Sequence, residues 1–167
     1  MHIATPAAVE LEVPTVKVGR WNDQNDVLAA QQNQLQNQPD DEAKDHFIER
    51  NGVEFAGTHL LLDLYGADHL DDIARIEQAM RDIVSACGAT LLHIHLHHFS
   101  PSGGVSGVAV LSESHISVHT WPERDYAAFD VFMCGDAQPE NAVPVLKRAF
   151  FPHRIEVCEE LRGRVAK

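Results

Sequence analysis

Apolar and polar positions follow two different periods along the chain from Gly57 onward. Stretches that alternate with a period of two, or that stay apolar for a few residues before a turn residue, predict strands. Such stretches cover 58–65, 89–99, 107–112, 116–121, 127–134 and 154–160. Apolar residues that recur every three or four positions predict helices at 70–87 and 139–150.

The expected order of elements is therefore β-α-β-β-β-β-α-β, with short connections. This order predicts an α+β fold, a two-layer sandwich of a mainly antiparallel sheet with both helices on one face. Two acidic residues, Asp71 and Asp72, fall in the first turn expected for the first helix, and Gly88 is placed to end that helix.

The first 50 residues differ from the rest of the chain. The stretch 24–41 is poor in apolar residues and rich in Gln and Asn, a composition that cannot bury enough surface to fold alone. We expect residues 1–50 to be a disordered extension, with an interaction arm as the alternative. Residues 51–167 are then expected to form one domain.

Composition excludes several classes of protein. The 167 residues are 44% hydrophobic, which is sufficient for the core of one domain. Acidic residues outnumber basic ones by 25 to 13, which disfavours binding to nucleic acid. No stretch resembles a signal peptide or a membrane span. The cysteines, Cys87, Cys134 and Cys158, are odd in number and widely spaced, so we expect a cytoplasmic protein without disulfides.

Polar groups concentrate where two short apolar strands meet, in the segment 105–123. Buried strands favour apolar residues, and a bend reading Ser-Glu-Ser-His lacks the usual turn residues. A strained bend would let the hydroxyl of Ser114 attack the carbonyl of Glu113, which replaces the amide by an ester through an oxyanion. Ser106 could donate a hydrogen bond to that oxyanion, and His119 could remove the α-proton of Ser114.

Loss of the α-proton breaks the ester by β-elimination and leaves dehydroalanine at a new N-terminus. Hydrolysis of dehydroalanine releases ammonia and leaves a pyruvoyl group at position 114. The chain could in this way make its own carbonyl cofactor. A substrate amine condenses with such a carbonyl, which then accepts the electrons released as carbon dioxide leaves.

Six short motifs occur in order over 57–156. They are Gly57-Thr58-His59-Leu60-Leu61, Phe99-Ser100-Pro101, Gly104-Val105-Ser106-Gly107, Ser112-Glu113-Ser114-His115, His119-Thr120-Trp121-Pro122-Glu123 and Asp130-Val131-Phe132-Met133-Cys134-Gly135. With these motifs the chain resembles the prokaryotic S-adenosylmethionine decarboxylase proenzymes, a pyruvoyl-dependent family. The resemblance implies the same two-layer fold, a homodimer, and production of the aminopropyl donor for spermidine biosynthesis.

The resemblance also implies roles for individual residues. Cleavage falls between Glu113 and Ser114, Ser114 becomes the pyruvoyl group, and Ser106 and His119 assist that cleavage. Cys134 protonates the substrate carbon after decarboxylation. Substrate contacts are implied for Phe99, Trp121 and Glu123, and His115 either contacts substrate or supports the bend. The loop 101–104 is one residue longer than the commonest form of the family, which affects where Phe99 lies.

Cleavage would divide the chain into residues 1–113 and 114–167. Because the second piece contributes strands to the same sheet, we expect the two pieces to stay associated. Cys87 and Cys158 match no site motif and are expected to be structural.

Other readings remain open at this stage. A pyruvoyl enzyme of the same fold could act on arginine or ornithine instead. A non-catalytic protein could bind metal, because His93, His95 and His97 share one face of a predicted strand, or it could regulate a related enzyme. A solvated or dimer-forming face explains these histidines equally well, and we expect no metal.

Overall fold

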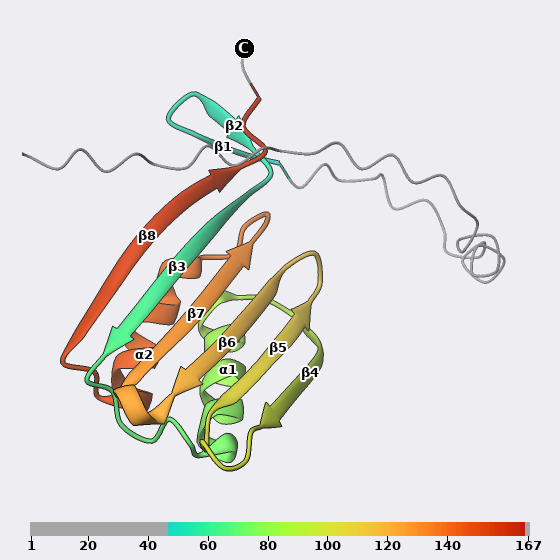
Figure 1. Ribbon diagram of the computed structural model, residues 1–167. Coiled ribbons are helices and arrows are strands. Elements are labelled where there is room, and N and C mark those ends of the chain that lie inside the picture. Colours follow the sequence, from blue (N-terminus) through green and yellow to red (C-terminus); the bar gives the residue numbers. More distant parts are fainter. Residues whose placement is uncertain (1–46, 166–167) are drawn as a thin grey trace, which may run out of the picture. The chain divides into compact units, whose positions relative to one another are not determined.

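The computed structural model describes residues 47–165. Its centre is a six-stranded sheet in the order β4-β5-β6-β7-β3-β8, in which all neighbouring strands are antiparallel (Figure 1). The strands are β3 (Gly57–Tyr65), β4 (Leu91–His98), β5 (Val105–Leu111), β6 (His115–Trp121), β7 (Tyr126–Met133) and β8 (Arg154–Arg162). The helices α1 (Ile73–Cys87) and α2 (Ala142–Phe150) both lie on one face of this sheet. The predicted α+β sandwich and its order of elements are confirmed.

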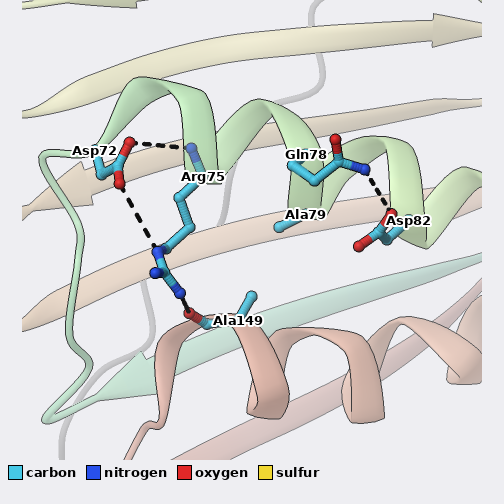
Figure 2. Close-up of a pocket in the computed structure, with 6 residues that line it drawn as sticks. All are labelled: Asp72, Arg75, Gln78, Ala79, Asp82 and Ala149. Atoms are coloured by element: carbon cyan, nitrogen blue, oxygen red, sulfur yellow. Dashed lines mark hydrogen bonds and ion pairs between the residues drawn. The ribbon is translucent and has the colours of Figure 1, made fainter.

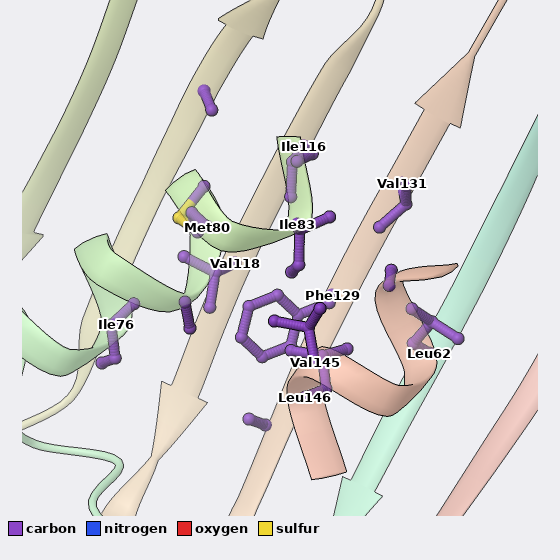
Figure 3. Packing of buried hydrophobic residues seen from close by; sticks show 14 of the residues in the cluster. Leu62, Ile76, Met80, Ile83, Ile116, Val118, Phe129, Val131, Val145 and Leu146 are labelled. Carbon is purple, nitrogen blue, oxygen red and sulfur yellow. The ribbon is translucent and has the colours of Figure 1, made fainter. Parts of the chain in front are cut away.

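The two faces of the sheet differ in composition because side chains alternate along each strand. In β6, Ile116 and Val118 point to the helices and are fully buried, whereas His115 and His119 point away from them. Figure 3 shows the buried face, where apolar side chains of α1 and α2 pack over β6, β7 and β3. We call the opposite face, which no helix within residues 47–165 covers, the outer face.

The ends of α1 explain why its boundaries differ slightly from the prediction. Asp72 is the N-cap residue, and its side chain accepts a hydrogen bond of 3.1 Å from the backbone N–H of Arg75. Gly88 ends the helix with φ +74°, a conformation that suits glycine. Before α2, Pro139 begins a short 3₁₀ turn (η2, Pro139–Asn141), so the α-helix starts later than predicted.

A small hairpin precedes the main sheet and was not predicted. It consists of β1 (Ile48–Arg50) and β2 (Val53–Phe55), and Arg50 forms an ion pair with Glu159 of β8. Strands of three residues are too short to give a periodic pattern. The disordered extension was predicted for residues 1–50, and residues 1–46 of it lie outside the described residues. Its last three residues, 48–50, form β1.

Two further features concern membranes and thiols. In the part of the chain that the structure describes, no helix is long and apolar enough to cross a membrane. The three cysteines are free: Cys87 is buried, Cys134 half-buried and Cys158 exposed. Burial raises the pKa of the Cys87 thiol to about 11, in keeping with a structural role.

Candidate active site

The bend between β5 and β6 holds the predicted cleavage point in an unusual conformation. Glu113 has φ +59°, a left-handed conformation that costs a residue with a Cβ roughly 1–2 kcal/mol. The bend is fixed from two sides. The backbone N–H of Leu111 donates to the carbonyl of Ser114 at 2.9 Å, and that of Ser112 donates to the carbonyl of Thr90 at 2.9 Å. The strain therefore lies on the residue whose carbonyl would be attacked.

Ser114 lies beside Cys134. Its side chain is buried, and the backbone N–H of Cys134, directly after β7, donates to its hydroxyl oxygen at 3.1 Å. Burial raises the pKa of the Cys134 thiol, Glu113 raises it further, and a hydrogen bond with Ser114 opposes both effects. The thiol is therefore held in its protonated form, which suits a proton donor.

A hollow of about 180 Å³ opens at Ser114. It is lined by the bend 112–114, the loop 134–137 after β7, and the segment 88–90 between α1 and β4. Three connections from different parts of the sequence thus meet at one end of the sheet. This space lies next to the position where the carbonyl cofactor would form.

Ser106 and His119 meet each other but do not meet Ser114. They are paired across β5 and β6, and Ser106 Oγ lies 2.8 Å from His119 Nδ1. His119 is four residues along β6 from His115, which directly follows Ser114. Four residues of a strand span roughly 13 Å. Although Ser114 lies in the bend, the histidine of the same chain cannot reach it.

His115 belongs to a second hollow, of about 270 Å³, on the outer face beside Ser114. The rings of His115 and Phe132 lie 5.5 Å apart and tilted by 31°, and His59 meets both rings edge-on. Arg162 completes the lining. Burial lowers the pKa of His115 and His59 lowers it further, against the opposing charge of Asp130. His115 is therefore favoured in its neutral form.

The sequence analysis assigned no role to His59, which lines this hollow, or to Asp130, which faces His59. His59 Nε2 lies 3.6 Å from Asp130 Oδ1, and the other oxygen of Asp130 accepts a hydrogen bond of 2.7 Å from Ser117. Both His59 and Asp130 stand in motifs quoted above. Only the order of strands, with β7 beside β3, brings them together.

The other three candidate substrate-binding residues, Phe99, Trp121 and Glu123, lie at the opposite end of the sheet from Ser114 and His115. Phe99 follows β4, is 45% exposed and contacts the ring of His97 at 4.6 Å. Trp121 ends β6, and its ring lies 5.3 Å from that of Tyr126. Glu123 follows in a 3₁₀ turn (η1, Pro122–Arg124). The longer loop is closed by two backbone hydrogen bonds between Phe99 and the glycines at 103 and 104.

The histidines of β4 stand in a row on the outer face. His93, His95 and His97 are exposed and alternate with Ile94 and Leu96, which pack against the core. Among residues 47–165, no three His, Cys, Asp or Glu side chains form a group that could hold a metal ion.

A further hollow, of about 370 Å³, lies between α1 and α2 (Figure 2). Arg75 crosses it: its Nη1 donates to the carbonyl of Ala149 at 3.2 Å, and its Nε lies 3.8 Å from Asp72. A cation at the last carbonyls of a helix is favourable. We interpret Arg75 as a structural residue that links α1 to the C-terminal end of α2. Ser114 does not line this hollow.

Comparison with known proteins gives one consistent result. Residues 58–163 match the sequence model of a family described as S-adenosylmethionine decarboxylase. A protein of Thermomicrobium roseum named S-adenosylmethionine decarboxylase proenzyme is 47% identical over 110 residues, which cover 65% of this chain and 95% of that protein. A protein of the same name from Methanococcus maripaludis is 50% identical over 110 residues, covering 64% of this chain and 89% of that protein.

The fold gives the same answer. A crystal structure of the adenosylmethionine decarboxylase from Aquifex aeolicus superimposes with a TM-score of 0.60 at 34% identity, covering 68% of this chain and 95% of that one. The matched region contains both ends of the β5–β6 hairpin and the thiol beside Ser114. This chain belongs to the S-adenosylmethionine decarboxylase family.

Proposed function

We propose that this chain cleaves itself between Glu113 and Ser114, and that the pyruvoyl group made from Ser114 serves as its cofactor. The activity of the chain is the decarboxylation of S-adenosylmethionine, as its family and its named relatives indicate. The product is the aminopropyl donor for spermidine. The observation that carries the proposal is the strained bend at Glu113, with the buried hydroxyl of Ser114 hydrogen-bonded to Cys134.

The cleavage step uses atoms already in the bend. Ser114 Oγ attacks the carbonyl carbon of Glu113, and the C–N bond breaks so that Glu113 is joined to Ser114 by an ester. Removal of the α-proton of Ser114 expels the carboxylate of Glu113 and leaves a double bond between Cα and Cβ. Water then hydrolyses this dehydroalanine, which releases the nitrogen of residue 114 as ammonia and leaves a carbonyl oxygen in its place. The hydrogen bond from Cys134 supports this proposal because it holds the hydroxyl oxygen in a fixed place.

Besides holding the hydroxyl of Ser114 through its backbone N–H, Cys134 acts after cleavage through its thiol. A pyruvoyl group at position 114 would supply the electron sink that decarboxylation needs. Cys134 then delivers a proton to the substrate carbon, since its raised pKa keeps the thiol protonated at neutral pH. The hollow at the bend gives the substrate access to both residues.

We propose that the working unit is a homodimer formed through the outer face. In one copy, His119 and its partner Ser106 lie roughly 13 Å along β6 from His115, the residue that follows Ser114. A second copy, packed face to face, can supply Ser106 and His119 to the bend of the first. The outer face also exposes Val108 and Val110, which favours burial against a partner.

One tautomer of His119 allows both tasks of this pair. If His119 Nδ1–H donates to Ser106 Oγ, the hydroxyl proton of Ser106 remains available to the oxyanion. The lone pair on His119 Nε2 then remains available to take the α-proton. The opposite tautomer would use up the proton of Ser106 and leave no base.

The substrate contacts follow from the same arrangement. Phe99, Trp121 and Glu123 lie at the His119 end, so in a homodimer they approach the Ser114 of the other copy. Aromatic rings can stack on the adenine, and the carboxylate can accept hydrogen bonds from nucleoside groups. His115 contacts the substrate from the copy that holds Ser114.

The two cleavage products are expected to stay together because their strands interleave. Residues 1–113 contribute β4, β5 and β3, and residues 114–167 contribute β6, β7 and β8. In the sheet, β3 lies between β7 and β8 and is hydrogen-bonded to both. Separation would break three strand interfaces.

Mass spectrometry of the purified full-length protein tests the proposal. We expect two polypeptides whose masses correspond to residues 1–113 and to residues 114–167 with a pyruvoyl N-terminus. One intact chain, or a new N-terminus that retains serine, would contradict it. Carbon dioxide release measured with S-adenosylmethionine, arginine and ornithine in parallel tests the substrate; no observation favours the last two or a non-catalytic role.

A further inference from the structure

The outer face carries its charge unevenly. The outward positions of β4, β5 and β6 hold five histidines, which we call the imidazole patch: His93, His95, His97, His115 and His119. The remaining outward positions of these strands are Ser106, Val108, Val110, Ser117 and Trp121. In this half of the face, no outward side chain is a carboxylate, a lysine or an arginine.

The other half of the face holds both signs of charge. Its acidic and basic side chains are Asp130 on β7, Asp63 on β3, and Arg154, Glu156, Glu160 and Arg162 on β8, with His59 on β3. Several carboxylates already have partners there: Asp130 binds Ser117 and faces His59, Asp63 accepts from Tyr126, and Glu156 pairs with Arg154. Beyond the strand ends lie Glu113 in the bend and Glu123, Arg124 and Asp125 after Trp121.

An imidazole is the side chain whose charge changes between pH 5 and 8. A neutral imidazole can be buried against a second copy, whereas a protonated one would have to give up its water. No outward residue of β4–β6 is a carboxylate that could pair with such a charge, and Asp130 of β7 opposes this effect only at His115. Two facing copies double the charge, so acid opposes association strongly.

We propose that the imidazole patch is a self-association surface that binds a second copy of this chain only while its rings are neutral. This inference rests on the proposed homodimer and adds its regulation. Because each site needs Ser106 and His119 from the other copy, acid dissociation would also switch the enzyme off. In general, an imidazole of ordinary pKa that must lose a proton on binding weakens association about tenfold at pH 5.5, and one such ring in each of two copies weakens it about a hundredfold.

The test measures the dimer dissociation constant of the full-length protein at pH 7.5 and pH 5.5 by analytical ultracentrifugation. EDTA is present throughout so that chelated metal cannot join the copies, and far-UV circular dichroism monitors folding. We expect the dissociation constant to rise at least about a hundredfold at pH 5.5, with an unchanged dichroism spectrum.

Two variants and a control make the test specific. His93→Gln/His95→Gln leaves His97 in contact with Phe99 and should reduce the rise at least about tenfold. His93→Lys/His95→Lys should weaken the dimer already at pH 7.5. The control, His69→Gln/His98→Gln, changes a loop histidine and one on the opposite side of β4, and should behave as the unaltered chain.

Each possible result either supports or overturns the inference. A dimer whose dissociation constant does not change with pH, or a glutamine variant that responds to acid like the unaltered chain, overturns the inference and leaves the proposed function standing. A monomer at pH 7.5 overturns both. Loss of the dichroism signal together with dissociation shows that unfolding is the cause, which also overturns the inference.

Discussion

The two ends of the β5–β6 hairpin differ in what surrounds their serines. At the bend, Ser114 is buried beside Cys134, next to a residue in a strained conformation. At the far end, Ser106 lies on the open outer face and shares a hydrogen bond with His119. The first end holds the bond that we propose is cleaved, whereas the second holds the proposed base and hydrogen-bond donor. The difference supports the proposed homodimer, in which each chain would contribute one half to each of two sites.

Removal of the hydroxyl at the bend should have the largest effect. We expect Ser114→Ala to remain one intact chain and to lose decarboxylase activity by at least about 10⁴-fold, since no carbonyl can form. Ser112→Ala is the matched control, because it removes a neighbouring hydroxyl and keeps the N–H that bonds Thr90. Denaturing electrophoresis and carbon dioxide release measure the two effects. Cleavage of Ser114→Ala would exclude the proposed nucleophile.

The separation of the two ends can be tested by complementation. His119→Ala alone should slow cleavage by about 10²–10⁴-fold, the usual contribution of a general base. Coexpression with Ser114→Ala should restore cleavage of the His119→Ala chain, because the second copy supplies the imidazole. Mass spectrometry identifies which chain is cut. Mixed dimers in which neither chain is cleaved would show that the two ends do not meet across copies.

The thiol at the bend should affect decarboxylation but not cleavage. We expect Cys134→Ala to be cleaved normally and to release product about 10²–10⁴-fold more slowly, with Cys134→Ser intermediate. The thiol is active in its protonated form, so activity should persist at alkaline pH until the raised pKa is reached. The pH profile of kcat measures this limit. A profile unchanged by Cys134→Ser would assign the alkaline limb to another group.

The smallest effect concerns the strain itself. In the Ser114→Ala background, which removes cleavage, Glu113→Gly should stabilise the fold by about 1 kcal/mol, because glycine adopts φ +59° without strain. Glu113→Ala removes the same carboxylate and keeps the strain. Urea unfolding compares the two variants. Equal midpoints would show that the bend is relaxed and that its conformation does not drive cleavage.

The sequence was sufficient to predict the strands of the main sheet and the two helices, but not the distances between their residues. Periodicity predicted β6 and the helices, because each buries one face and repeats that requirement along its length. The contact of Ser106 with His119 depends on the register of β5 with β6. The contact of His59 with Asp130 depends on β7 lying beside β3. Pairing of distant strands leaves no local pattern.

The position of β3 between β7 and β8 has a consequence for the lifetime of the cleaved protein. Before cleavage, an opened sheet can close again within one chain. After the proposed cleavage, β3 and its two neighbours would belong to different polypeptides, so recovery from unfolding would require an encounter that depends on concentration. Cleavage would thus make the native state harder to regain once lost, and the lifetime of the enzyme would depend on how slowly its sheet opens.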